Sequence, residues 1–172
     1  MKLLTIFLLC LATTAMARGT YQEPANFVND VFDNSPPAAS RLWITKPLRN
    51  SITKILGHKP DSLRVRYWGE GKKTAWILDE IGKEKPITVG IVVSDNKIKR
   101  IKVLIFRESR GWEVRHDFFT NQFKGASLTS AQSLSKPIDG ISGATLSVRA
   151  LTKISRLALY LHQQTPFSHD SP

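Results

Sequence analysis

The sequence predicts an α+β fold: an antiparallel meander sheet flanked by helices, with a C-terminal helix that follows a loop of small residues. Apolar side chains recur at helical spacing over residues 43–56 and again over 146–163. Between these segments the pattern changes to alternation, in four successive runs separated by turn residues. Runs joined by short turns pair antiparallel, so the four runs predict one meander.

Residues 1–17 have the composition of a secretory signal peptide. Lys2 precedes an apolar run, and Ala15-Met16-Ala17 forms a cleavage site of small residues. The apolar run, Leu3 to Leu11, is far shorter than the ~20 residues that a membrane-spanning helix needs, so an uncleaved anchor is the weaker alternative. We therefore expect a periplasmic protein that begins at Arg18.

Cysteine usage restricts the redox chemistry. The only cysteine is Cys10, inside the predicted signal. The mature chain would then contain no disulfide, iron–sulfur cluster or c-type haem attachment, because each needs cysteine. The four histidines do not follow a metal-ligand spacing, so we predict no metal site. Any electron transfer would have to use an organic cofactor.

The chain is strongly basic, with a formal net charge of +11, of which Lys2 contributes one charge. Export makes nucleic acid an improbable partner, and we predict none. The remaining interpretations are a peripheral contact with anionic lipid headgroups, an acidic surface on a partner protein, and simple solubility.

The first helical segments precede the sheet. Residues 21–32 are compatible with one helix, which 34–37 (Asn-Ser-Pro-Pro) separate from the next. The spacing predicts a second helix over 43–56, with Pro47 in its first turn and Gly57 as its stop. Its apolar face is expected to pack in the core: Leu48, Ile52, Ile55 and Leu56.

Four strands are predicted over 63–68, 73–80, 86–94 and 97–107. Residues 69–71 (Gly-Glu-Gly) are expected to turn the first strand into the second, and Asp95-Asn96 the third into the fourth. Basic residues at strand positions are most simply the solvated face of the sheet. The densest basic run is expected to be a docking patch for a redox partner: Lys97, Lys99, Arg100 and Lys102.

Regular patterning weakens between residues 108 and 136. Three phenylalanines are expected to pack a short helix against the sheet: Phe118, Phe119 and Phe123. The acidic residues of this stretch, and His116 beside Asp117, are weak evidence for acid–base chemistry. We assign no catalytic residue, and whether the protein is an enzyme stays open.

Residues 139–147 (Asp-Gly-Ile-Ser-Gly-Ala-Thr-Leu-Ser) are the most informative part of the chain. Asp139-Gly140 is expected to form a turn and Ser142 to cap the following helix. A helix N-terminus offers unpaired N–H groups to a phosphate, Gly143 permits close approach, and Thr145 offers a hydroxyl. From residue types alone, an ordinary capped helix start explains the segment equally well.

The string resembles the flavinylation motif of the FMN-binding domain family, which includes the C subunit of the sodium-translocating NADH:quinone reductase and the G subunit of the Rnf complex. The resemblance implies that a flavin transferase, using FAD, joins FMN covalently through a phosphoester to Thr145. The other cofactor-binding residues that it implies are Asp139, Gly140, Ser142, Gly143, Ala144 and Ser147.

The resemblance extends to Glu108–Gly111 and Gln122–Gly125, with Arg110 where the family usually has proline. It implies an extracytoplasmic electron carrier that exchanges electrons with membrane-bound or periplasmic redox proteins. The alternative is a secreted basic binding protein that uses the 139–147 loop for an anion or a partner. The expected organisation is a signal peptide (1–17), an N-terminal helical segment (18–62), an FMN-binding domain (63–164) and a tail (165–172).

Overall fold

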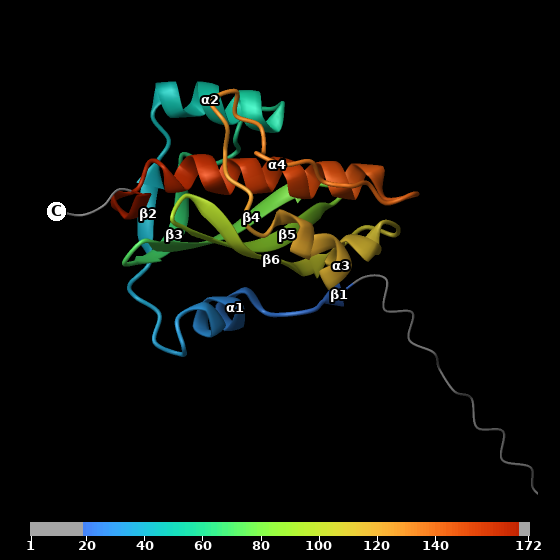
Figure 1. Ribbon diagram of the computed structural model, residues 1–172, viewed down its shortest axis with the longest axis horizontal. Helices are drawn as coiled ribbons and strands as arrows, with labels where there is room; N and C mark the ends of the chain where they lie inside the picture. Colours follow the sequence, from blue (N-terminus) through green and yellow to red (C-terminus); the bar gives the residue numbers. More distant parts are fainter. Residues whose placement is uncertain (1–18, 169–172) are drawn as a thin grey trace, which may run out of the picture.

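The computed structural model describes residues 19–168, in which helices cover both faces of a six-stranded antiparallel sheet (Figure 1). The strand order is β1-β6-β5-β4-β3-β2. Its central four strands form the predicted meander: β3 (Arg64–Glu70), β4 (Lys73–Ile81), β5 (Pro86–Ser94) and β6 (Lys97–Phe106). The predicted α+β class is confirmed. The predicted signal peptide and the last four residues of the tail lie outside the described residues.

Two short edge strands were not predicted. β1 (Gly19–Thr20) pairs with β6, and β2 (Ser40–Trp43) pairs with β3. Trp43 therefore lies in a strand, and the prediction that a helix begins there was wrong. The helix α2 (Lys46–Leu56) starts three residues later, with Pro47 in its first turn and Gly57 as a left-handed C-cap, as predicted.

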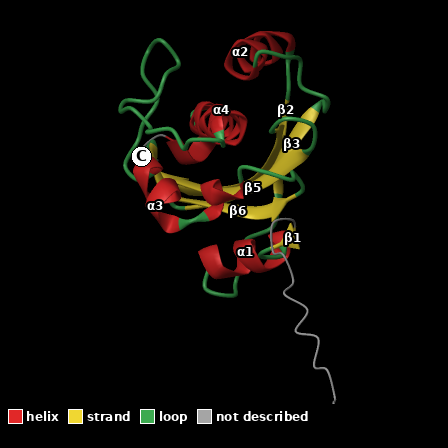
Figure 2. Cartoon of the chain, turned by 90° about the vertical axis from the view of Figure 1, so that its right-hand side faces the viewer, coloured by secondary structure: helices red, strands yellow, loops and turns green. Residues whose placement is uncertain are grey.

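The helices α2 and α4 (Thr145–His162) lie on one face of the sheet. Figure 2 shows α4 between α2 and the long loop, residues 124–144, that precedes α4 in the chain. The predicted inner faces of both helices are buried: Leu48, Ile52, Ile55 and Leu56 in α2, and Leu151, Ile154, Leu157, Ala158 and Leu161 in α4. Arg156 on α4 also donates to the carbonyl of Gln132, which ties this loop to the helix.

The opposite face carries α1 (Pro24–Val31), which occupies part of the predicted 21–32 helix. The ring of Phe27 lies against β5 at Gly90, where an added Cβ would be 2.6 Å from a ring carbon. Any larger residue at position 90 would displace this ring. Figure 2 shows β2 and β3 curving away from α1, so that α1 covers only part of this face.

Two of the three turns in the meander have two residues each. Asp95 and Asn96 have φ values of 52° and 56°, which is the backbone of the favoured two-residue hairpin, so this predicted turn is confirmed. The β3–β4 turn lies at Gly71-Lys72. Gly69 and Glu70, expected in that turn, are the last residues of β3.

Three short helices follow β6: η1 (Trp112–Arg115), α3 (Asp117–Thr120) and η2 (Asn121–Phe123). Phe119 and Phe123 are fully buried, as predicted, whereas Phe118 is 64% exposed and does not pack in the core. A last short helix, η3 (Pro166–Ser168), follows α4. None of the helices between residues 19 and 168 combines the length and apolar composition that crossing a membrane requires.

Candidate functional site: the 139–147 loop and the adjacent groove

The 139–147 loop makes a tight turn directly before α4. The N–H of Ala144 donates to the carbonyl of Ile141 at 3.0 Å, and Gly143 takes a φ of +82°. The turn therefore lies at Ser142-Gly143, and the prediction of a turn at Asp139-Gly140 was wrong. Because few side chains adopt a positive φ, this position favours glycine.

The first helical residue of α4 is Thr145. Ala144 is the N-cap residue, and no side chain caps the helix. The prediction that Ser142 is the N-cap was wrong, because Ser142 is used in the preceding turn and lies two residues too early. The first N–H groups of a helix have no partner inside the helix. Without a side-chain cap, those of α4 remain available to an anion.

The seven predicted site residues divide into two groups. Five are exposed: Asp139, Gly140, Ser142, Gly143 and Thr145. Ala144 and Ser147 are buried, at 3% and 4% exposure. Thr145 is therefore accessible to another macromolecule, such as a modifying enzyme, whereas Ser147 faces the protein interior.

Ser147 packs against Gly111. A Cβ added at Gly111 would lie 2.5 Å from the Ser147 Oγ, and Gly111 has a φ of +82°. Both the space and the backbone thus favour glycine at position 111. The stretch 108–111 is in this way pressed against the first turn of α4.

Glu108 has a structural role that its position in the sequence did not indicate. Its buried carboxylate accepts hydrogen bonds from the backbone N–H groups of Lys83, Glu84 and Lys85, the last two at 2.6 and 2.9 Å. Burial by itself would raise the pKa of Glu108, but the three N–H donors and the charge of Lys83 lower it below its usual value. Glu108 therefore stays ionised and holds the β4–β5 turn.

Gln122 connects the 122–125 stretch to the 139–147 loop. Its Oε1 accepts a hydrogen bond from the backbone N–H of Asp139 at 2.7 Å, at the start of the loop. The stretches 108–111 and 122–125 thus both contact residues 139–147, the first through Ser147 and the second through Asp139. Arg110, which stands where proline is usual, is exposed.

An open groove of about 530 Å³ lies between the end of α2 and the first half of α4, and Thr145 lines it. Its apolar lining comes from Ile55, Leu56 and Val148. Four cationic side chains also line it: Lys54, Arg149, Lys153 and Arg156. The sequence did not predict this groove, because α2 lies about ninety residues before α4 and nothing in its pattern indicated where it packs.

Buried Glu80 fixes one wall of this groove. Its carboxylate oxygens lie 3.0 Å from the Nε2 of His58, just after α2, and 3.1 Å from the Nζ of Lys153 on α4. The hydrogen bonds of the His58 ring to the carbonyl of Lys59 and to Glu80 raise its pKa, against the smaller effects of burial and of Lys153. The end of α2 is thereby held to both β4 and α4.

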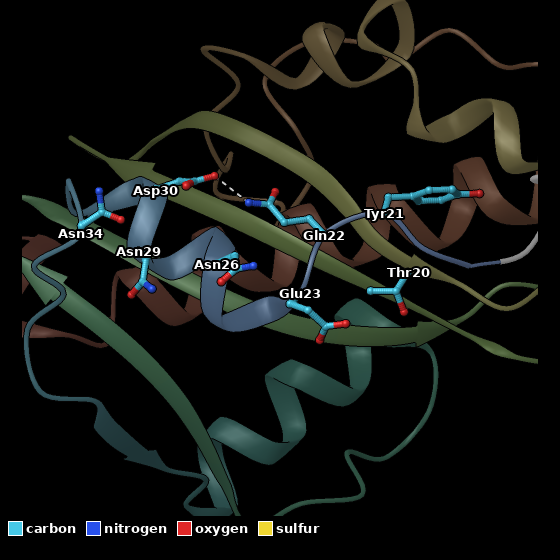
Figure 3. Close-up of a pocket in the computed structure, with 8 residues that line it drawn as sticks. All are labelled: Thr20, Tyr21, Gln22, Glu23, Asn26, Asn29, Asp30 and Asn34. Carbon is cyan, nitrogen blue, oxygen red and sulfur yellow. Dashed lines mark hydrogen bonds between the residues drawn. The ribbon is translucent and has the colours of Figure 1, made fainter.

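Two other hollows have a different character. Figure 3 shows the one beside α1, of about 630 Å³, whose charged side chains are Glu23 and Asp30; these would repel a phosphate. A second, of about 430 Å³, lies between β6 and α3. It gathers Lys99, Arg100 and Lys102 of the predicted docking patch with Lys124, while Lys97 does not line it. Residues 19–168 contain no cluster of His, Cys, Asp or Glu side chains that could hold a metal ion.

The fold and the loop define an α+β domain whose helix α4 starts at an exposed hydroxyl beside a basic groove. Residues 82–160 match the family model of the FMN-binding domain. The chain therefore contains a domain of this family, and it is a flavin-binding protein with FMN as its cofactor. The matched segment includes residues 108–111, 122–125 and 139–147. A search of curated proteins found no match to the chain.

Proposed function

We propose that this protein carries FMN covalently on Thr145 and acts as an extracytoplasmic electron carrier. The observation that carries the proposal is the position of Thr145. Its side chain is exposed at the first residue of α4, in the Ser-Gly-Ala-Thr string, and it lines the groove between α2 and α4.

The groove has the chemistry that FMN requires. A phosphate at Thr145 would lie at an uncapped helix N-terminus and on the same groove as Arg149, which together favour negative charge. The apolar side chains of Ile55, Leu56 and Val148 offer a surface for a planar ring system. Lys54 is a further cation beside this surface, whereas Lys153 and Arg156 already pair with Glu80 and with the carbonyl of Gln132.

The attachment asks for no catalytic group from this chain. A phosphoester bond forms between the Thr145 Oγ and the FMN phosphorus of FAD, the bond to AMP breaks, and the hydroxyl proton is released. A flavin transferase would supply FAD and the catalytic groups, so the chain only has to present the hydroxyl. Bound FMN supplies one- and two-electron chemistry, and the residues of the groove would hold it and limit its contact with water.

Export and the carrier role rest on other features. Residues 1–17 have the composition of a signal peptide, and the only cysteine lies within them. A cofactor that cannot dissociate suits a compartment in which free flavin would be lost. The basic hollow between β6 and α3 would receive an acidic redox partner, either membrane-bound or periplasmic.

Coexpression with a flavin transferase tests the attachment site. The wild-type protein should give a fluorescent band in a denaturing gel and the FMN mass increment, whereas Thr145→Ala should give neither and still fold. Thr152→Ala is the matched control, because Thr152 lies on the same helix and lines the same groove. FMN retained by Thr145→Ala, or lost equally by Thr152→Ala, would contradict the assignment.

A further inference from the structure

The edge of the sheet formed by β2 and β3 carries an unusual set of exposed side chains. Arg41 lies directly opposite Arg66, and Trp43 directly opposite Arg64. Directly opposed residues of an antiparallel pair point to the same face. The four residues therefore form one surface, the β2–β3 patch: Arg41, Trp43, Arg64 and Arg66.

This patch faces away from the core. All four residues are exposed, and 61% of Trp43 is accessible. The Arg64 guanidinium lies 5.8 Å from the centre of the Trp43 ring. On β3, Trp68 still packs against the cluster that α1 forms with β4–β6. Figure 2 shows that β2 and the rest of β3 curve away from α1.

Folding stability does not explain the arrangement. Like charges directly opposite each other in a strand pair are destabilising, yet Arg41 and Arg66 are so placed. Within residues 19–168, none of the three arginines lies within ion-pair distance of a carboxylate. One basic residue on an edge strand protects it from aggregation, but an exposed tryptophan beside it does the opposite.

We propose that the β2–β3 patch binds the surface of an anionic phospholipid membrane. Three unpaired arginines supply attraction to negative headgroups, and Trp43 supplies the aromatic ring that inserts at the level of the headgroups. The patch is an open strand surface, which suits a broad membrane surface. β2 lies at the opposite end of the molecule from the start of α4, so the 139–147 loop would remain accessible to other proteins (Figure 1).

Vesicle flotation of the exported protein tests this proposal. Wild-type protein should float with vesicles of phosphatidylglycerol and phosphatidylcholine in equal parts, and not with phosphatidylcholine alone. Each basic residue near such a surface contributes roughly fivefold to binding, so the triple variant Arg41→Gln, Arg64→Gln, Arg66→Gln should bind about a hundredfold more weakly. Trp43→Ser should bind about tenfold more weakly.

The matched control removes three other exposed charges through Lys97→Gln, Lys99→Gln and Lys124→Gln, and it should bind almost as the wild type does. Melting temperatures establish that each variant is folded. Equal weakening of both triple variants would overturn the proposal, because total charge would then explain binding. Equal binding by all variants, or binding that ignores lipid charge, would also overturn it. None of these outcomes depends on whether Thr145 carries FMN.

Discussion

At the scale of single residues, the contact between Gly111 and Ser147 links two stretches that are far apart in the sequence. Ser147 belongs to the flavinylation-like string but is buried, so its part in the string is to pack against Gly111. Thr145, two residues earlier, is exposed. One turn of helix therefore combines a residue that reacts in our proposal with a residue that fixes where the reaction occurs.

This contact makes Gly111→Ala a sharp test. The added methyl group would meet the Ser147 Oγ and would also require a positive φ, so we expect a loss of about 3 kcal/mol in the free energy of unfolding. Gly125→Ala isolates the backbone effect, because Gly125 has nearly the same φ and open space around it. It should lose only about 1 kcal/mol. Chemical denaturation measures both.

The double variant Gly111→Ala with Ser147→Ala distinguishes the two causes. Removing the Ser147 hydroxyl should restore most of the difference between the two glycine substitutions, which a double-mutant cycle measures as a coupling energy. A coupling near zero would show that the backbone at Gly111, and not its packing on α4, is what requires glycine.

The sequence predicted the loop before α4, but it did not predict which loop residue forms the turn and which caps the helix. The composition of residues 139–147 was enough to predict a loop that enters a helix and to single out Thr145. It could not show whether Ser142 or Ala144 would be the N-cap, because serine is favoured both in turns and at caps. The role of Glu108 depends on a turn about 25 residues away, which no local pattern reveals.

At the scale of elements, the attachment of α2 to the sheet should depend on pH. His58 has a raised pKa, so its contribution to stability is fully present below its ordinary pKa of 6.5 and is lost as pH rises through the folded-state pKa. The free energy of unfolding of the wild type should therefore fall over that range. The effect should stay within about 1 kcal/mol, because His58 is nearly half exposed.

The variant His58→Gln is the control, because glutamine can still donate to Glu80 but does not titrate. Thermal melts of both proteins across this pH range give the difference in stability between them. This difference should shrink as pH rises. If it stays constant with pH, the contact between His58 and Glu80 does not involve a protonated ring.

Helices and strands with a clear hydrophobic period could be predicted from the sequence. Short strands that form only because a neighbouring strand pairs with them could not. The meander followed from alternation, and the inner faces of α2 and α4 followed from helical spacing. β1 and β2 have two and four residues, too few for a period to be visible, and they exist because β6 and β3 offer unpaired backbone groups. The sequence could not predict the groove beside Thr145 for the same reason, because the groove depends on how α2 and α4, which are distant in the chain, pack together.

At the scale of the whole molecule, the positive charge is divided among distinct surfaces. The β2–β3 patch, the groove beside Thr145 and the hollow between β6 and α3 each gather three or four cationic side chains. A net charge of +11 on the full sequence gives a field that attracts anions from a distance, and these surfaces determine where they bind.

The hollow between β6 and α3 should speed electron transfer to an acidic partner. Screening lengths fall from about 30 Å at 0.01 M salt to about 10 Å at 0.1 M, so the second-order rate of flavin reoxidation should fall steeply over this range. Replacing Lys99 and Lys124 in this hollow with glutamate should slow the rate about tenfold or more at low salt. Lys83→Glu with Lys85→Glu changes the charge equally at exposed positions outside the hollow and should have a smaller effect.

Stopped-flow mixing of the reduced flavoprotein with purified periplasmic cytochromes measures these rates. A rate that ignores salt, or that falls equally in both variants, would exclude the hollow as the docking site and would leave the attachment of FMN to Thr145 unaffected.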